Sequence, residues 1–296
     1  MLLGFLIDNK NILFDDVEIK PLPDIQDKID RFYENDSVSK GFIYPPLQEL
    51  DKTKEEERKF ASKTMVNSAF YTLESTHSIS KSNYDEEKIK FLILAYGFLH
   101  GVYLRPDGYL CIKKTPYEPG KLTGVLPPNV DDCIKGMKAF SLFYDMSINE
   151  QRKLLFSIIH WFLLGQCYEY AWDRFSAQYL VLDSIFNLSG LNASHAERPQ
   201  ILANSYRIAI PNWAITRSVV KNNRNVQTCT LADIRNDLFH EAKYAGEPIG
   251  YAYPEENFDL EFVRFNLQLI ISILGLSSNI LRSSVRQRGT DVWNFQ

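Results

Sequence analysis

The sequence predicts an α+β protein, in which an N-terminal β-rich mixed domain precedes an all-α bundle of four or five helices. Strand-forming patterns dominate roughly the first 75 residues, and residues 115–131 then hold four prolines and two glycines. Beyond residue 131, apolar residues recur with helical spacing almost to the end of the chain. A chain of 296 residues can bury the cores of two domains. We therefore expect one domain over residues 1–130, ending in the proline-rich linker, and one over residues 131–296, with one large domain as the alternative.

Short strands are expected in the N-terminal domain. Residues 5–7 and 12–14 are apolar and flank the polar run from Asp8 to Asn11, a pattern typical of a β-hairpin. Residues 17–19 alternate as a half-buried strand would. A helix is expected over residues 88–104, followed by a second hairpin with its turn at Arg105 to Gly108.

Helices are expected throughout the second domain. One covers residues 131–144, with Asp131 or Asp132 as its cap, and residues 149–187 form two more that break near Gly165. Another covers residues 231–244, and residues 258–280 supply the last long helix. These segments account for the predicted bundle.

Composition limits the functions that the chain can have. With 45% hydrophobic and 24% charged residues it is typical of a soluble globular protein, and its apolar runs are too short to span a membrane. Four widely spaced cysteines form no CxxC pair, which favours buried thiols in a reducing cytoplasm over a zinc site or disulfides. Glycine-rich phosphate loops, GxSxG elbows and HExxH pairs are absent from the sequence, so we expect no NTPase, hydrolase or metalloprotease of those types and no cofactor.

The run RNDLFH, from Arg235 to His240, carries the clearest chemistry. Arginine can hold a phosphate with two parallel hydrogen bonds, and histidine can move a proton near neutral pH. On a straight helix Arg235 and His240 lie about 140° apart, whereas Asn236 and His240 share a face. The flexible arginine could wrap toward that face, or a second subunit could complete the site. We expect a shared site at a dimer seam, with Asn236 orienting His240. The other histidines (His77, His100, His160 and His195) stand alone in the sequence.

Positive charge gathers in front of this motif. Between residues 198 and 235 the only acid is Asp233, although the whole chain has a net charge of −4; the basic residues are Arg198, Arg207, Arg217, Lys221, Arg224 and Arg235. Such a segment could follow the backbone of an RNA, with Arg217, Lys221 and Arg224 as the binding residues. A solvated loop without a ligand is the alternative.

With these features, residues 147–282 resemble the HEPN superfamily (higher eukaryotes and prokaryotes nucleotide-binding), and most closely its ApeA-like bacterial group. The resemblance lies in two long helices, a polar insertion, a helix bearing Arg-Asn-x-x-x-His and a closing helix. Its most specific parts are the stretches IRNDLFHEAKYAGEPIGY and YEYAWDRFSAQYLVLDSIF.

The resemblance implies a metal-independent ribonuclease of a toxin–antitoxin or anti-phage system. Arg235, Asn236 and His240 match the motif positions, and Asp183 falls where many members carry an acid facing the motif. Asp183 could pair with Arg235 or be a plain surface acid. Glu241 stands where many members have glycine; it would repel phosphate, yet could raise the pKa of His240.

The expected function is therefore RNA cleavage by attack of the 2′-hydroxyl on the adjacent phosphate. Arg235 would hold the phosphate and His240 would act as general base or acid. The expected partners are RNA, a second copy of the chain and an antitoxin or defence protein, with no membrane. The alternative is a non-catalytic helical module that binds a partner protein or a nucleotide.

Overall fold

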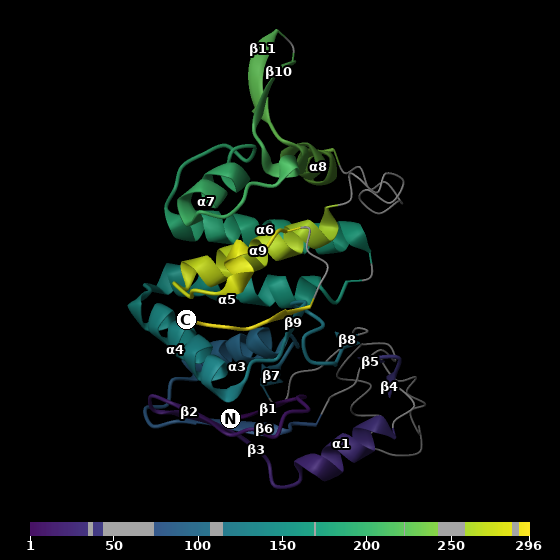
Figure 1. Cartoon of the computed structure of the whole chain (residues 1–296), viewed down its shortest axis with the longest axis vertical. Coiled ribbons are helices and arrows are strands. Elements are labelled where there is room, and N and C mark those ends of the chain that lie inside the picture. The colour runs from purple at the N-terminus through teal and green to yellow at the C-terminus, as the bar shows by residue number, and fades with distance from the viewer. Residues whose placement is uncertain are drawn as a thin grey trace, which may run out of the picture.

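The computed structural model describes residues 1–34, 38–43, 74–106, 115–168, 170–221, 223–241, 258–285 and 290–296. It confirms the predicted fold class, since an N-terminal antiparallel sheet precedes a mostly helical region. Figure 1 shows the elements stacked along the long axis of the molecule, with the sheet at one end and a protruding hairpin at the other. No helix in the described part of the chain is long and apolar enough to cross a membrane.

Five strands form the N-terminal sheet, in the order β2-β3-β6-β1-β7. They are β1 (Leu2–Gly4), β2 (Ile12–Phe14), β3 (Val17–Pro21), β6 (His77–Lys81) and β7 (Arg105–Pro106). Inward-facing side chains alternate along them, as the sequence pattern predicts for a half-buried sheet; these are Ile12, Phe14, Val17, Ile19 and Ile79.

The first predicted hairpin is wrong, because residues 5–7 form no strand. β2 pairs with β3 around the two-residue turn Asp15-Asp16, and β1 pairs instead with β6 and β7. Asp15 has a φ of 49°, a left-handed conformation that aspartate tolerates better than most residues. The residues expected to start the second turn, Arg105 and Pro106, form β7, and the remaining part of that hairpin from residue 107 onward lies outside the described residues.

Smaller elements flank this sheet. Helix α1 (Ile25–Tyr33) is followed by a three-stranded sheet of β4 (Val38–Ser39), β5 (Phe42–Ile43) and β8 (Thr115–Pro116). In the C-terminal region, β12 (Asp291–Val292) pairs in parallel with β9 (Val125–Leu126).

Helix α3 (Glu86–His100) is buried along most of its length, because it packs between the sheet and the following helices (Figure 1). Asp85 caps its start by accepting a hydrogen bond from the amide of Lys88. The helix ends four residues earlier than predicted, at a cap formed by Gly101 with a φ of 62°. A Cβ atom on Gly101 would lie 2.5 Å from the Cα of Gly120, so both the conformation and the close approach require glycine.

The long helices match the predicted segments. They are α4 (Val130–Met146), α5 (Asn149–Gly165), α6 (Ala171–Ser189) and α9 (Asp259–Ile273). The predicted break near Gly165 is confirmed, and a Cβ atom on Gly165 would come within 2.7 Å of the Cβ of Ala177 on the neighbouring helix. Asn129 rather than an aspartate caps α4. The last predicted helix stops at Ile273 and continues only as a 3-10 turn, η3 (Asn279–Arg282).

The main hydrophobic core of the described residues runs from the sheet through α3 to α9, and a smaller cluster forms around Phe5 and Phe32. The C-terminal residues join it, since the indole nitrogen of Trp293 donates to the carbonyl of Leu99 at 2.7 Å. The division into residues 1–130 and 131–296 stays a prediction.

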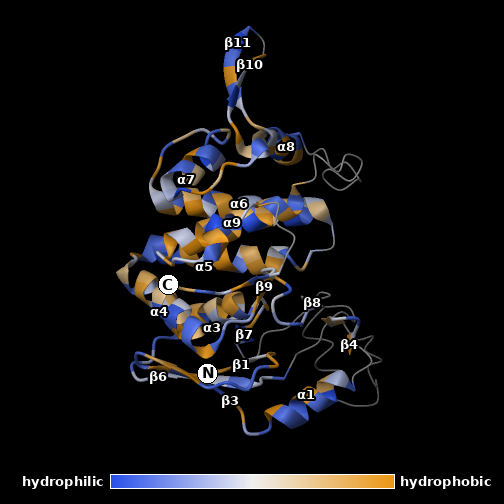
Figure 2. Ribbon diagram, in the orientation of Figure 1, coloured by the Kyte–Doolittle hydropathy of each residue, from blue (hydrophilic) through white to orange (hydrophobic). Residues whose placement is uncertain are grey.

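The polar stretch between α6 and α8 is structured. It contains α7 (Arg198–Tyr206), the 3-10 turn η1 (Asn212–Ala214) and a hairpin of β10 (Arg217–Lys221) and β11 (Arg224–Thr228), which leads into α8 (Thr230–Phe239). The hairpin projects away from the body, and hydrophilic and hydrophobic residues are mixed along its two strands (Figure 2). The side chain of Val220 is 72% exposed, so the hairpin is not packed into the core.

Candidate functional site

The candidate site lies where α6, α7 and α8 meet, at the end of the molecule that carries the hairpin (Figure 1). Helix α8 is anchored at its start, because Leu231 and Ala232 are buried and the sulfur of Cys229 accepts a hydrogen bond from the amide of Ala232 at 3.4 Å. Burial raises the pKa of the Cys229 thiol, which makes it a structural rather than a reactive cysteine. The opposite end of α8 presents the motif residues.

Arg235 brings the three motif residues together within one chain. Its Nη1 atom donates to Oδ1 of Asn236 at 3.1 Å and makes a close contact with Nε2 of His240. His240 follows the last residue of α8, Phe239, and keeps a helical backbone conformation with its amide bonded to the carbonyl of Asn236, so the long side chain of Arg235 bends across the 140° offset to reach it. Of the two alternatives that the sequence left open, the arginine reaches His240 within one chain, and completion of the site by a second subunit stays a prediction.

Two aromatic rings lie beside the guanidinium of Arg235. Its Cζ atom is 5.9 Å from the ring centre of Tyr179, on α6, and 5.8 Å from that of Phe239. The two rings are 6.2 Å apart. These contacts fix the position of the arginine side chain while Asn236 and His240 remain exposed to solvent.

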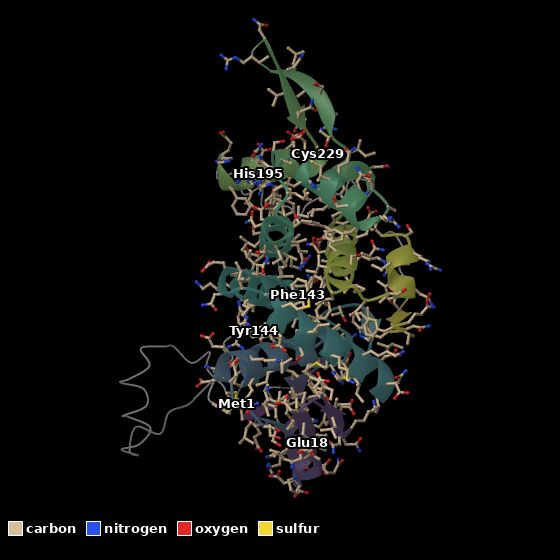
Figure 3. The ribbon with its side chains drawn as sticks, turned by 90° about the vertical axis from the view of Figure 1, so that its left-hand side faces the viewer. Met1, Glu18, Phe143, Tyr144, His195 and Cys229 are labelled. Carbon is tan, nitrogen blue, oxygen red and sulfur yellow. The ribbon has the colours of Figure 1, made fainter. Side chains whose placement is uncertain are left out.

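His195 belongs to the same cluster, although its sequence position stands apart from the motif. It lies in the segment between α6 and α7, and its Nδ1 atom is 2.9 Å from the hydroxyl of Tyr179. Figure 3 places His195 at the hairpin end of the molecule, far from Met1 and Glu18 in the sheet. The site thus holds two histidines, not one.

Asp183 pairs with Arg198 instead of Arg235. Oδ1 of Asp183 accepts from Nη1 of Arg198 at 2.8 Å and lies 3.8 Å from Nδ1 of His195. Both Asp183 and Tyr179 project from α6, one helical turn apart. The suggested pairing of Asp183 with the motif arginine is therefore corrected to an ion pair with Arg198.

The surroundings shift the pKa values of Tyr179 and His195 in opposite directions. Burial raises the pKa of the Tyr179 hydroxyl, and the carboxylate of Asp183 raises it further, so this hydroxyl stays protonated. Burial lowers the pKa of His195, and the charge of Arg198 lowers it as well. Asp183 acts against this effect, whereas Arg235 and His240 add to it.

The predicted RNA-binding residues lie on the hairpin. Arg224 is exposed, and the backbone of Lys221 pairs with it at the tip. Arg217 lies at the base, where its Nη2 atom is 3.1 Å from the carboxylate of Asp233. Arg217 therefore offers less free positive charge than the sequence suggests. Glu241 is exposed beside His240.

Sequence reasoning missed three members of the cluster, namely Tyr179, His195 and Arg198. One signal was present, since Tyr179 and Asp183 stand four residues apart in a helix and so share a face. Across the described ranges, no three His, Cys, Asp or Glu side chains lie close enough together to hold a metal ion. No family model matches the chain, and neither a curated protein nor a solved structure does.

Proposed function

We propose that this chain is a HEPN-type endoribonuclease that cleaves RNA without a metal ion. The 2′-hydroxyl attacks the adjacent phosphorus, the bond to the 5′ oxygen breaks, and the products are a 2′,3′-cyclic phosphate and a 5′-hydroxyl. Arg235 stabilises the charge that builds up on the phosphate, Asn236 orients its neighbours, and His240 transfers a proton.

The contact of Arg235 with both Asn236 and His240 carries this proposal. A group that donates hydrogen bonds to the phosphate and a group that transfers a proton must lie within a few ångströms of each other to act on one scissile bond. Arg235 and His240 are in direct contact. Both Asn236 and His240 are exposed, so a single strand of RNA can reach them.

The hairpin supplies a route for the rest of the RNA. Arg224 and Lys221 lie toward its tip and Arg217 at its base, which is next to the start of α8. A strand of RNA that follows these residues would be led toward the motif helix. The biological role that fits such an enzyme is that of a toxin or anti-phage effector held in check by a partner protein, acting as a homodimer in the cytoplasm.

A second candidate function, the non-catalytic binding module, is favoured by the hairpin itself. A two-stranded ribbon with little of its surface packed is marginally stable alone, and its outer edges are open to pairing with another chain. Under this alternative the hairpin binds a partner protein, and the Arg235 cluster is structural.

Cleavage of a labelled single-stranded RNA in the presence of EDTA separates the two functions. The wild type should release fragments that end in a 2′,3′-cyclic phosphate, and it should leave a DNA strand of the same sequence intact because DNA lacks the attacking hydroxyl. His240→Ala should abolish cleavage while the free energy of unfolding changes by less than about 0.5 kcal/mol, as is usual for an exposed side chain. A folded wild type that binds a partner and cleaves no RNA would support the binding module instead.

A further inference from the structure

Two histidines share the neighbourhood of Arg235, and they differ in their surroundings. His240 is exposed at the end of α8 and contacts Arg235 directly. His195 is half-buried, held by Tyr179, and is close enough for Arg235 and His240 to influence its charge. Cleavage by a 2′-hydroxyl needs one group that takes a proton and another that gives one.

The hydrogen bonds of His195 leave one ring nitrogen for a substrate. Nδ1 lies 2.9 Å from the Tyr179 hydroxyl and 3.8 Å from Asp183, whereas no hydrogen bond joins Nε2 to any described residue. When the proton sits on Nδ1, the Tyr179 oxygen accepts it and Nε2 presents a lone pair. The nearby carboxylate of Asp183 then stabilises the positive ring that forms when Nε2 takes a second proton.

We propose that His195 is the general base of the reaction proposed above, on which this inference rests, and that His240 is the general acid. His195 Nε2 accepts the proton of the 2′-hydroxyl as the 2′ oxygen bonds to phosphorus. The bond from phosphorus to the 5′ oxygen breaks, and that oxygen takes a proton from protonated His240, whose contact with Arg235 opens first because an arginine can only donate to Nε2. His195 ends with one proton more and His240 with one fewer, so exchange with water restores both residues.

The charged groups around His195 favour its neutral form, which a general base needs. On α6 it faces Tyr179 and Asp183, on α7 it faces Arg198, and on α8 it faces Arg235 and His240. Burial and the three positively charged or titratable neighbours lower its pKa, with Asp183 opposing them. A lowered pKa keeps the ring neutral at neutral pH, which is the form that accepts a proton.

A substrate with a modified leaving group tests the assignment. In an RNA whose scissile 5′ oxygen is replaced by sulfur, the leaving thiolate needs no proton. His195→Ala and His240→Ala should each slow cleavage of ordinary RNA by about 100-fold or more. On the sulfur substrate His240→Ala should recover nearly wild-type rates, whereas His195→Ala should stay slow.

His160 provides the matched control. It is also half-buried, its Nδ1 atom lies 2.7 Å from the hydroxyl of Tyr103, and burial lowers its pKa too, but it lies on α5 away from Arg235. His160→Ala should cleave both substrates at the wild-type rate. His195→Ala with wild-type rates on both substrates would overturn the inference while the ribonuclease proposal survives. Rescue of His195→Ala, and not of His240→Ala, by the sulfur substrate would overturn the assignment of base and acid.

The protonation of His195 can also be measured directly in the wild-type protein, without an activity assay. Nitrogen-15 NMR of the imidazole rings should show His195 with its proton on Nδ1 at neutral pH and with a pKa below the ordinary value. A proton on Nε2 at neutral pH would overturn the proposed base. A wild type that cleaves neither substrate would overturn the ribonuclease proposal and this inference together.

Discussion

Arg198 and Asp183 form an ion pair between α7 and α6, with Nη1 of the arginine 2.8 Å from Oδ1 of the aspartate. The same carboxylate oxygen lies 3.8 Å from His195, so the pair acts on the histidine in two opposing ways. Arg198 lowers the pKa of His195 and Asp183 raises it. The carboxylate therefore limits how far the neighbouring cations depress the basicity of this ring.

Asp183→Asn should lower the pKa of His195 further, because Arg198 would act on it without a counter-charge. The acid limb of the pH–rate profile should move to lower pH, and the maximal rate should fall because the charged ring loses its partner. NMR titration of His195 measures the first effect directly. Asp145→Asn, which breaks the remote ion pair with Lys88, is the control and should leave this titration unchanged. A His195 pKa that rises in Asp183→Asn would contradict the geometry.

Arg235→Lys should lower turnover much more than RNA affinity. A lysine keeps the charge but cannot give a phosphate the two parallel hydrogen bonds of a guanidinium, and a phosphate clamp acts mainly in the transition state. Steady-state cleavage and equilibrium binding, measured on the same RNA, give the two quantities. Arg224→Lys is the control on the hairpin, where a single charge suffices. Equal losses of turnover and affinity would count against the clamp.

Neutralising Arg217, Lys221 and Arg224 together should weaken RNA binding at every sequence tested. It should also flatten the dependence of log K on log salt by about 0.7 for each phosphate of a single strand that is no longer neutralised. Among single variants Arg217→Ala should have less effect than Arg224→Ala, since Asp233 already neutralises Arg217. Fluorescence anisotropy over a salt series measures both trends. Lys153→Ala on α5 serves as the control, and a triple variant that binds like the wild type would remove the hairpin from the RNA path.

Mixtures of Arg235→Ala and His240→Ala should stay inactive. Both residues act from the same chain, so a dimer of the two variants would hold no complete site, even if the chain forms the proposed homodimer. Cleavage after co-refolding, with sedimentation to measure the dimer, tests this. Activity restored in the mixed dimer would mean that the site is shared between subunits after all.

A separate pH dependence of stability is expected from His77 in the sheet. This side chain is fully buried, and burial lowers its pKa from 6.5 to about 4. The unfolded chain therefore binds a proton between pH 6.5 and 4 that the folded chain does not. The free energy of unfolding should fall by about 3 kcal/mol as pH drops through this window. Urea unfolding at pH 7 and pH 4.5 measures the fall, and it should be much smaller in His77→Gln.

Much of the helical region could be predicted because its signals are local. Apolar spacing and the glycine at residue 165 define α5 and α6 within a few residues. The sheet could not be predicted in the same way. β1 pairs with β6, more than 70 residues later, and the residue pattern of neither strand indicates which strand it pairs with.

Half of the candidate site was visible in the sequence. Arg235, Asn236 and His240 stand in one motif, so spacing was enough to find them. His195 becomes part of the site only through the turn between α6 and α7, which brings it to Tyr179. Helical spacing alone did not indicate that the arginine side chain bends across the helix surface to reach His240.

The strand order of the N-terminal sheet has a consequence for how the chain folds. β1 precedes both of its neighbours along the chain, and they lie at residues 77–81 and 105–106, so its hydrogen bonds can be completed only after about 100 further residues have been synthesised. The α5–α6 pair, by contrast, joins segments only a few residues apart and closes a short loop. Helical contacts should therefore form early, and the docking of β1 should be a late, slow phase that refolding kinetics can detect.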